Sequence, residues 1–71
     1  MLSKELDDTN RWLLLTASGS FVPRWGRLNA LLAAFLQSRE GVPVVKAVRS
    51  LDGEEMDAIV MHGFWRRLGW Q

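Results

Sequence analysis

Cysteine is absent from the 71-residue sequence, and His62 is its only histidine. No disulfide can form, and a structural zinc site, which takes four Cys or His ligands, lacks the residues it needs. Covalent and acid–base catalysis usually need a thiol, an activated serine or an imidazole beside a second functional group, and the sequence offers no such combination. We therefore expect a protein without enzymatic activity, catalytic residues, metal or cofactor.

Four acidic side chains lie close together at Asp52, Glu54, Glu55 and Asp57. A calcium loop needs oxygen ligands at alternating positions of a longer loop that ends in Glu, and this segment has a different spacing. The dipole at a helix N-terminus stabilises negative side chains, which explains the cluster better than a metal does. We expect no metal ligand here.

Long apolar runs and a strong net charge are also missing. The longest unbroken apolar run, residues 30–36, is far shorter than the roughly 20 residues that a membrane-spanning helix needs. Residues 1–8 are acidic and lack the apolar core of a secretory signal. A net charge of +1 gives no general attraction to nucleic acid or anionic lipid. Together with the lack of cysteine, these features predict a cytoplasmic protein with no membrane span.

The composition, 48% hydrophobic and 24% charged, is that of an ordinary globular domain, and the length allows one domain over residues 1–71. Chains this short bury a small core and usually gain stability from disulfides, a metal or a partner subunit. Because the first two are excluded, we expect a homodimer. The alternative is that well-packed helices give the monomer enough stability on their own.

Apolar spacing predicts an all-α fold, a small three- to four-helix bundle completed by homodimerisation. The first helix is capped by Ser3 and ends near residues 18–20. The second begins at Pro23, a residue favoured in the first helical turn, and ends at Gly41.

A third, shorter helix is expected from Pro43, although the β-branched run over residues 42–48 could also form a strand. A fourth helix is predicted from the capping-box pair Asp52 and Glu55, with Gly63 inside it and Gly69 as its stop. We expect close packing of a neighbouring backbone at Gly63. The expected buried stripe of this helix is Met56, Val60, Phe64 and Leu68.

Four tryptophans are many for so short a chain, and a small core cannot easily enclose all of them. Tryptophan and arginine dominate binding hot spots, because a rigid ring loses little entropy and a guanidinium forms paired hydrogen bonds. Trp25 and Trp65 each lie among arginines. The expected partner-binding residues are Phe21, Arg24, Trp25, Arg27, Trp65, Arg66 and Trp70. In the alternative interpretation the rings belong to the core and the arginines are solvated.

Arg24 and Arg27 fall in the first turn of the predicted second helix, where positive charge opposes the helix dipole. They therefore do not stabilise that helix. With the free amide groups of the helix start they could receive a carboxylate or a phosphate. The alternative is ordinary surface charge.

These features favour a small protein-protein interaction module, an inhibitor or modulator that docks on a host or cellular protein through an aromatic and arginine patch. Small size alone also suggests a phage or mobile element as its source. The alternative is nucleic-acid binding, either by a helix-turn-helix over residues 44–50, a turn at 51–53 and the next helix, or by stacking of single strands on the aromatic rings. The acidic cluster opposes the helix-turn-helix, since it would face phosphates. A weaker alternative is an interfacial membrane peptide.

Overall fold

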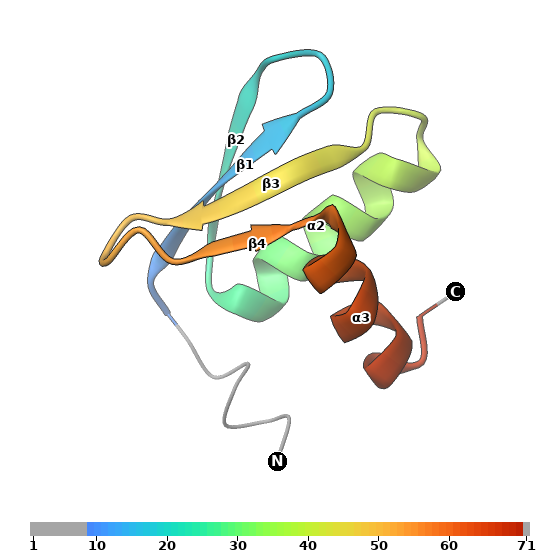
Figure 1. Ribbon diagram of the computed structural model, residues 1–71. Coiled ribbons are helices and arrows are strands. Elements are labelled where there is room, and N and C mark those ends of the chain that lie inside the picture. Colours follow the sequence, from blue (N-terminus) through green and yellow to red (C-terminus); the bar gives the residue numbers. More distant parts are fainter. Residues whose placement is uncertain (1–8, 71) are drawn as a thin grey trace.

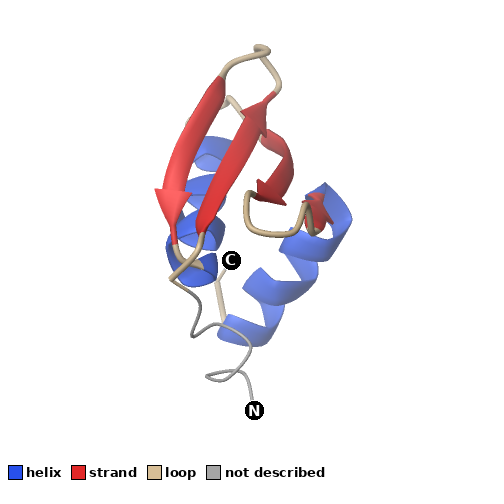
Figure 2. Cartoon of the chain, turned by 90° about the vertical axis from the view of Figure 1, so that its left-hand side faces the viewer, coloured by secondary structure: helices blue, strands red, loops and turns tan. Residues whose placement is uncertain are grey.

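The computed structural model describes residues 9–70, which form a small α+β domain (Figure 1). Its elements in chain order are β1 (Arg11–Thr16), β2 (Phe21–Trp25), α2 (Arg27–Arg39), β3 (Val44–Arg49), β4 (Glu55–Asp57) and α3 (Ala58–Leu68). The four strands form one antiparallel sheet in the order β2-β1-β3-β4. Both helices lie against the same face of this sheet (Figures 1 and 2). The expected all-α bundle is therefore wrong.

Strand β1 replaces the predicted first helix over the part of it that the structure describes; its cap, Ser3, lies outside residues 9–70. Trp12, Leu14 and Thr16 are buried, whereas Leu13 and Leu15 between them are only half-buried. This alternation has the period of two that places successive side chains on opposite faces of a sheet. Because apolar residues occupy both faces of β1, the sequence does not show that period.

Strand β2 contains Pro23, which was expected to open a helix. Proline fits an edge strand at a position whose missing N–H faces away from the ladder. Pro23 meets both conditions, since β2 is an edge of the sheet and Pro23 lies opposite Leu13 between the hydrogen-bonded positions. Gly26, with φ of 91°, turns the chain from the strand into α2. The second helix exists but begins at Arg27.

The chain from Val44 to Asp57 forms a β-hairpin around a turn at residues 50–52. The strand alternative for the β-branched run is confirmed, and a helix-turn-helix is excluded because β3 occupies the position of its first helix. The fourth helix begins at Ala58, and its N-cap is Asp57, whose Oδ1 accepts a hydrogen bond of 2.9 Å from the N–H of Val60. The predicted capping box is therefore wrong.

The core lies between the helix-covered face of the sheet and the two helices. Small residues of α2 let this helix approach the sheet closely. The buried apolar residues are Trp12, Leu14, Ala30, Leu31, Ala34, Val44, Ala47, Met56, Met61 and Phe64.

Only part of the expected stripe on the last helix is correct. Phe64 is buried and Leu68 half-buried, but Val60 is exposed and Met56 belongs to β4. The predicted close packing at Gly63 is wrong, because a Cβ there would meet no heavy atom within 4 Å. Gly69 ends the helix in the left-handed conformation, φ 82°, as predicted.

Candidate binding surfaces

Arg27 lies in an ion-pair network rather than on an open surface. Its Nη2 donates to Oε2 of Glu54 at 2.8 Å, and Nη2 of Arg49 donates to Oε1 of the same carboxylate at 2.8 Å. The two guanidinium carbons lie 5.2 and 5.6 Å from the ring centroid of the buried Trp12. The network fastens the β3–β4 hairpin to the start of α2, which gives Arg27 a structural role.

Asp52 extends this network on its exposed side. Arg49 donates to both oxygens of Asp52, at 3.1 and 2.7 Å, and the N–H of Glu54 donates to Oδ1 at 3.0 Å. The hydrogen bonds from Arg49, and next the one from Glu54, lower the pKa of Asp52 to about 2. Asp52 and Glu54, two members of the acidic cluster noted in the sequence, therefore act as ion-pair partners of arginine.

Trp65, Arg66 and Trp70 gather at the end of α3, around Phe35 of α2. The Trp65 and Trp70 rings each lie 5.4 Å from the Phe35 ring, centroid to centroid. The Trp65 Nε1–H donates to the carbonyl of Leu31 at 3.1 Å. Both indoles are half-buried, so this cluster, with Arg66 exposed beside it, joins the C-terminal segment to α2.

The second face of the sheet carries side chains that neither α2 nor α3 covers. We call this surface the open face; its residues are those at the outward positions of the four strands. Paired across the strands, they form three rows: Phe21, Leu15, Lys46 and Asp57; Pro23, Leu13, Val48 and Glu55; and Trp25 with Arg11. Phe21 and Trp25 are 63% and 64% exposed. On β1 and β2 the residues of the open face are apolar apart from Arg11. A sheet face in contact with water usually carries polar side chains, so this apolar half is unusual.

The free edge of β2 is closed to a further strand. Pro23 has no N–H, and its carbonyl accepts a hydrogen bond of 2.7 Å from Nη1 of Arg24. The carbonyl of Trp25 accepts a hydrogen bond of 2.6 Å from Nδ2 of Asn29. Proline and occupied carbonyls on an edge strand discourage its pairing with another chain.

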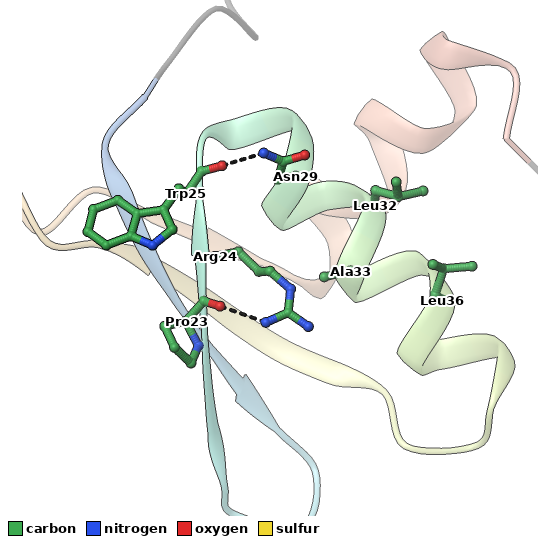
Figure 3. Close-up of a pocket in the computed structure, with 7 residues that line it drawn as sticks. All are labelled: Pro23, Arg24, Trp25, Asn29, Leu32, Ala33 and Leu36. Carbon is green, nitrogen blue, oxygen red and sulfur yellow. Dashed lines mark hydrogen bonds between the residues drawn. The ribbon is translucent and has the colours of Figure 1, made fainter.

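Between this edge and α2 lies a groove of about 430 Å³, shown in Figure 3. We call it the β2–α2 groove. The Arg24 side chain extends toward α2, whereas the Trp25 ring lies on the opposite side of the strand. Arg24 is the only charged residue of the lining, and no carboxylate of the described residues lies within ion-pair distance of it. The lining residues are Pro23, Arg24, Trp25, Asn29, Leu32, Ala33 and Leu36.

The seven predicted binding residues therefore occupy four places. Phe21 and Trp25 lie on the open face, Arg24 lies in the β2–α2 groove, Arg27 lies in the ion-pair network, and the other three lie at the end of α3. They do not form one patch. Sequence reasoning missed the contributions of Leu13, Leu15, Leu32 and Leu36, none of which is among the expected partner-binding residues. The four-residue spacing of Leu32 and Leu36 is correct for one face of a helix, but this face is exposed.

Within residues 9–70, no group of three or more His, Cys, Asp or Glu side chains could hold a metal ion, and no helix is long and apolar enough to cross a bilayer. The chain matches no family model, no curated protein and no solved structure.

Proposed function

We propose that this chain is a non-catalytic protein-binding module and that its β2–α2 groove receives an apolar helical segment of another protein. An acidic side chain of that segment pairs with Arg24. The observation that carries the proposal is the groove itself, which is apolar, contains one cation without a carboxylate partner among the described residues, and adjoins a closed strand edge.

The closed edge decides between the two common ways of binding a peptide beside a sheet. An extended peptide binds by main-chain hydrogen bonds to a free strand edge, which Pro23 and the occupied carbonyls of β2 do not offer. A helix satisfies its own backbone and needs only apolar contacts for one face. Leu32 and Leu36, one turn apart on α2, supply such contacts.

The charge of the groove favours an acidic segment. Arg24 uses one N–H for the carbonyl of Pro23 and keeps donors for a carboxylate, which it can bind through paired hydrogen bonds. Single-strand nucleic-acid binding would need cations beside stacking rings on one surface. Arg24 and the ring of Trp25 lie on opposite sides of β2, and Arg27 is held by Glu54. On the open face, Arg11 and Lys46 do lie among the rings, but the carboxylates of Glu55 and Asp57 share that surface and would repel phosphates. Protein binding is therefore the better supported function.

We also propose how the module acts, in which compartment, and in which oligomeric state. A module of this kind inhibits or modulates its partner by occupying the surface that the groove covers. The absence of cysteine supports a reducing compartment, and we propose the cytoplasm. We also propose that the chain forms homodimers, because it has a small core and neither disulfides nor a metal cluster in the described residues.

Site-specific photocrosslinking tests the proposal. A photoreactive residue replaces Leu32 in the groove or, as the control, the exposed Ile59 on α3, and the protein is irradiated in source-cell lysate with and without nuclease. The expected product is one protein, crosslinked from position 32 only and lost in an Arg24→Glu background. Mass spectrometry of the crosslinked peptide should identify an amphipathic helical segment with Asp or Glu. Crosslinking to nucleic acid, or equal yields from both positions, would contradict it.

A further inference from the structure

We propose that the open face of the sheet is the surface through which two copies of this chain associate. This inference rests on the homodimer proposed above and assigns its interface. It concerns the face opposite the helices, and not the β2–α2 groove.

The open face offers apolar area that no other element of residues 9–70 covers. On β1 and β2 its residues are Leu13, Leu15, Phe21, Pro23 and Trp25, which are exposed or half-buried. The only other member of this half is Arg11, opposite Trp25. Large exposed aromatic rings grouped on a flat apolar surface are typical of the centre of an interface.

The charges of the open face favour a second copy over an anionic partner. Arg11 and Lys46 provide two cations, Glu55 and Asp57 provide two carboxylates, and Lys46 Nζ lies 3.3 Å from Oε1 of Glu55. An anionic partner such as nucleic acid or a lipid surface would meet the carboxylates of β4. A second copy can instead cover the apolar half on β1 and β2 while the charges of β3 and β4 stay in water.

One arrangement keeps the charges of β3 and β4 out of the contact, and in it the two Arg11 side chains lie diagonally across the two-fold axis, each over an indole. A two-fold axis parallel to the strands, between β1 and β2, stacks β2 of each copy on β1 of the other at the usual sheet distance of about 10 Å. Phe21 then packs on the partner subunit's Leu15, and Pro23 packs on the partner subunit's Leu13. Trp25 covers the guanidinium of the partner subunit's Arg11, a favourable cation–π pair. The strands β3 and β4 remain at the rim with their charges in water.

The area of this interface predicts a weak, concentration-dependent dimer. Aromatic side chains bury roughly 150–250 Å² each, so two rings with about two thirds of that exposed contribute on the order of 250 Å² per copy. With Leu13, Leu15 and Pro23 the total is on the order of 500 Å² per copy, about 1,000 Å² for the dimer, which is the lower end for specific interfaces. The chain exposes 4542 Å², so about a ninth of its surface would be covered.

Sedimentation equilibrium of the full chain from about 1 μM to about 1 mM tests the inference. The expected result is reversible dimerisation, with a Kd that rises at least ~30-fold in the Phe21→Ala, Trp25→Ala double variant, as loss of a hot spot implies. Ile59→Ala, an equally exposed apolar truncation on α3, is the control and should leave the Kd unchanged. Arg11→Glu gives a second variant, which should also weaken the dimer. A monomer at all concentrations, or a dimer that none of these substitutions weakens, would overturn the inference.

The two surfaces can be tested separately. Arg24→Glu should abolish crosslinking from position 32 and leave the dimer intact, whereas the double variant should weaken the dimer and still crosslink from position 32. Loss of dimerisation in Arg24→Glu with an unaffected double variant would assign self-association to the groove and overturn the open-face interface. Failure of crosslinking alone would overturn the groove proposal and leave the open-face interface standing.

Discussion

Replacing Glu54 by glutamine removes the negative charge that joins two arginines beside the largest buried side chain. Oε2 of Glu54 binds Arg27 and Oε1 binds Arg49, each at 2.8 Å, and both guanidinium groups flank Trp12. Glutamine keeps the shape but can offer only one acceptor oxygen. Two positive charges in a partly apolar setting then lose their shared counter-charge.

The magnitude follows from the exposure of the three side chains. Arg27 and Arg49 are only 14% and 17% exposed, whereas Glu54 is 39% exposed. Hydrogen bonds to charged groups are worth about 1.5–3 kcal/mol each, but water around Glu54 screens these two, so we expect a loss of about 2 kcal/mol in all. For a domain of this size that corresponds to a decrease in Tm of roughly 8–16 °C.

Urea unfolding followed by circular dichroism measures this loss, with Glu55→Gln as the matched control. Glu55 pairs with Lys46 at 3.3 Å on the exposed side of the hairpin, where a salt bridge contributes about 0–0.5 kcal/mol. The m-value should not change in either variant, since the same surface is exposed on unfolding. Equal losses in the two variants would refute the structural role assigned to Glu54 and would return Arg27 to the candidate binding residues.

Three further predictions concern single side chains. Carboxyl NMR titration should give Asp52 a pKa of about 2. Because the pKa is lowered in the folded state, the stability that comes from pairing with Arg49 is present above about pH 4 and is lost as the pH falls toward 2. An ordinary pKa for Asp52 would contradict this pairing. Trp25→Ala should change the free energy of unfolding by less than about 0.5 kcal/mol, because the ring is exposed. Trp65→Ala should lower it by about 2–3 kcal/mol, because the Trp65 ring packs on Phe35 and donates a hydrogen bond. A larger loss for Trp25→Ala than for Trp65→Ala would be inconsistent with the burial of the two rings. Gly63→Ala should raise the free energy of unfolding by about 0.5–1 kcal/mol, because a Cβ there meets open space inside a helix, and a destabilised variant would indicate a hidden contact.

Strand β1 shows why the sequence predicted the wrong fold class. A strand is recognised by apolar and polar residues in alternation, and residues 12–15 are apolar without interruption. Such a run fits a helix stripe as well as a strand. The structure explains the run: Trp12 and Leu14 face the core, while Leu13 and Leu15 form part of the open face. The apolar residues that we assign to self-association therefore removed the alternating pattern by which the strand could have been recognised.

Other elements followed local rules and were predictable. Gly69 ends α3 as expected from its preference for positive φ, and the body of α2 lies inside the predicted second helix. The β-branched residues of β3 supported a strand, and the structure confirms that alternative. The helix start predicted at Pro23 was wrong, because proline suits both a helix start and an edge strand. Only the pairing partners of β2 distinguish the two.

The binding surfaces were predictable in residue type but not in position. Four tryptophans are more than the core holds, and only Trp12 is fully buried. Which ring is exposed depends on the sheet register, which brings Trp25 to the open face, and on the contact between α2 and α3, which partly buries Trp65. Similarly, the partner of Arg27 is Glu54, 27 residues away, beyond the reach of local patterns.

Charge exchange across the groove shows directly whether Arg24 recognises a carboxylate of the partner. The segment crosslinked from position 32 is prepared as two peptides, one native and one with its acidic residue replaced by lysine, and the affinity of each for the wild-type chain and for Arg24→Glu is measured by calorimetry. We expect the affinity of the native peptide to fall roughly 10- to 100-fold on Arg24→Glu and the lysine peptide to recover much of that affinity on the variant. If both peptides bind both proteins with the same affinity, Arg24 does not recognise a carboxylate and the proposed function of the groove is wrong.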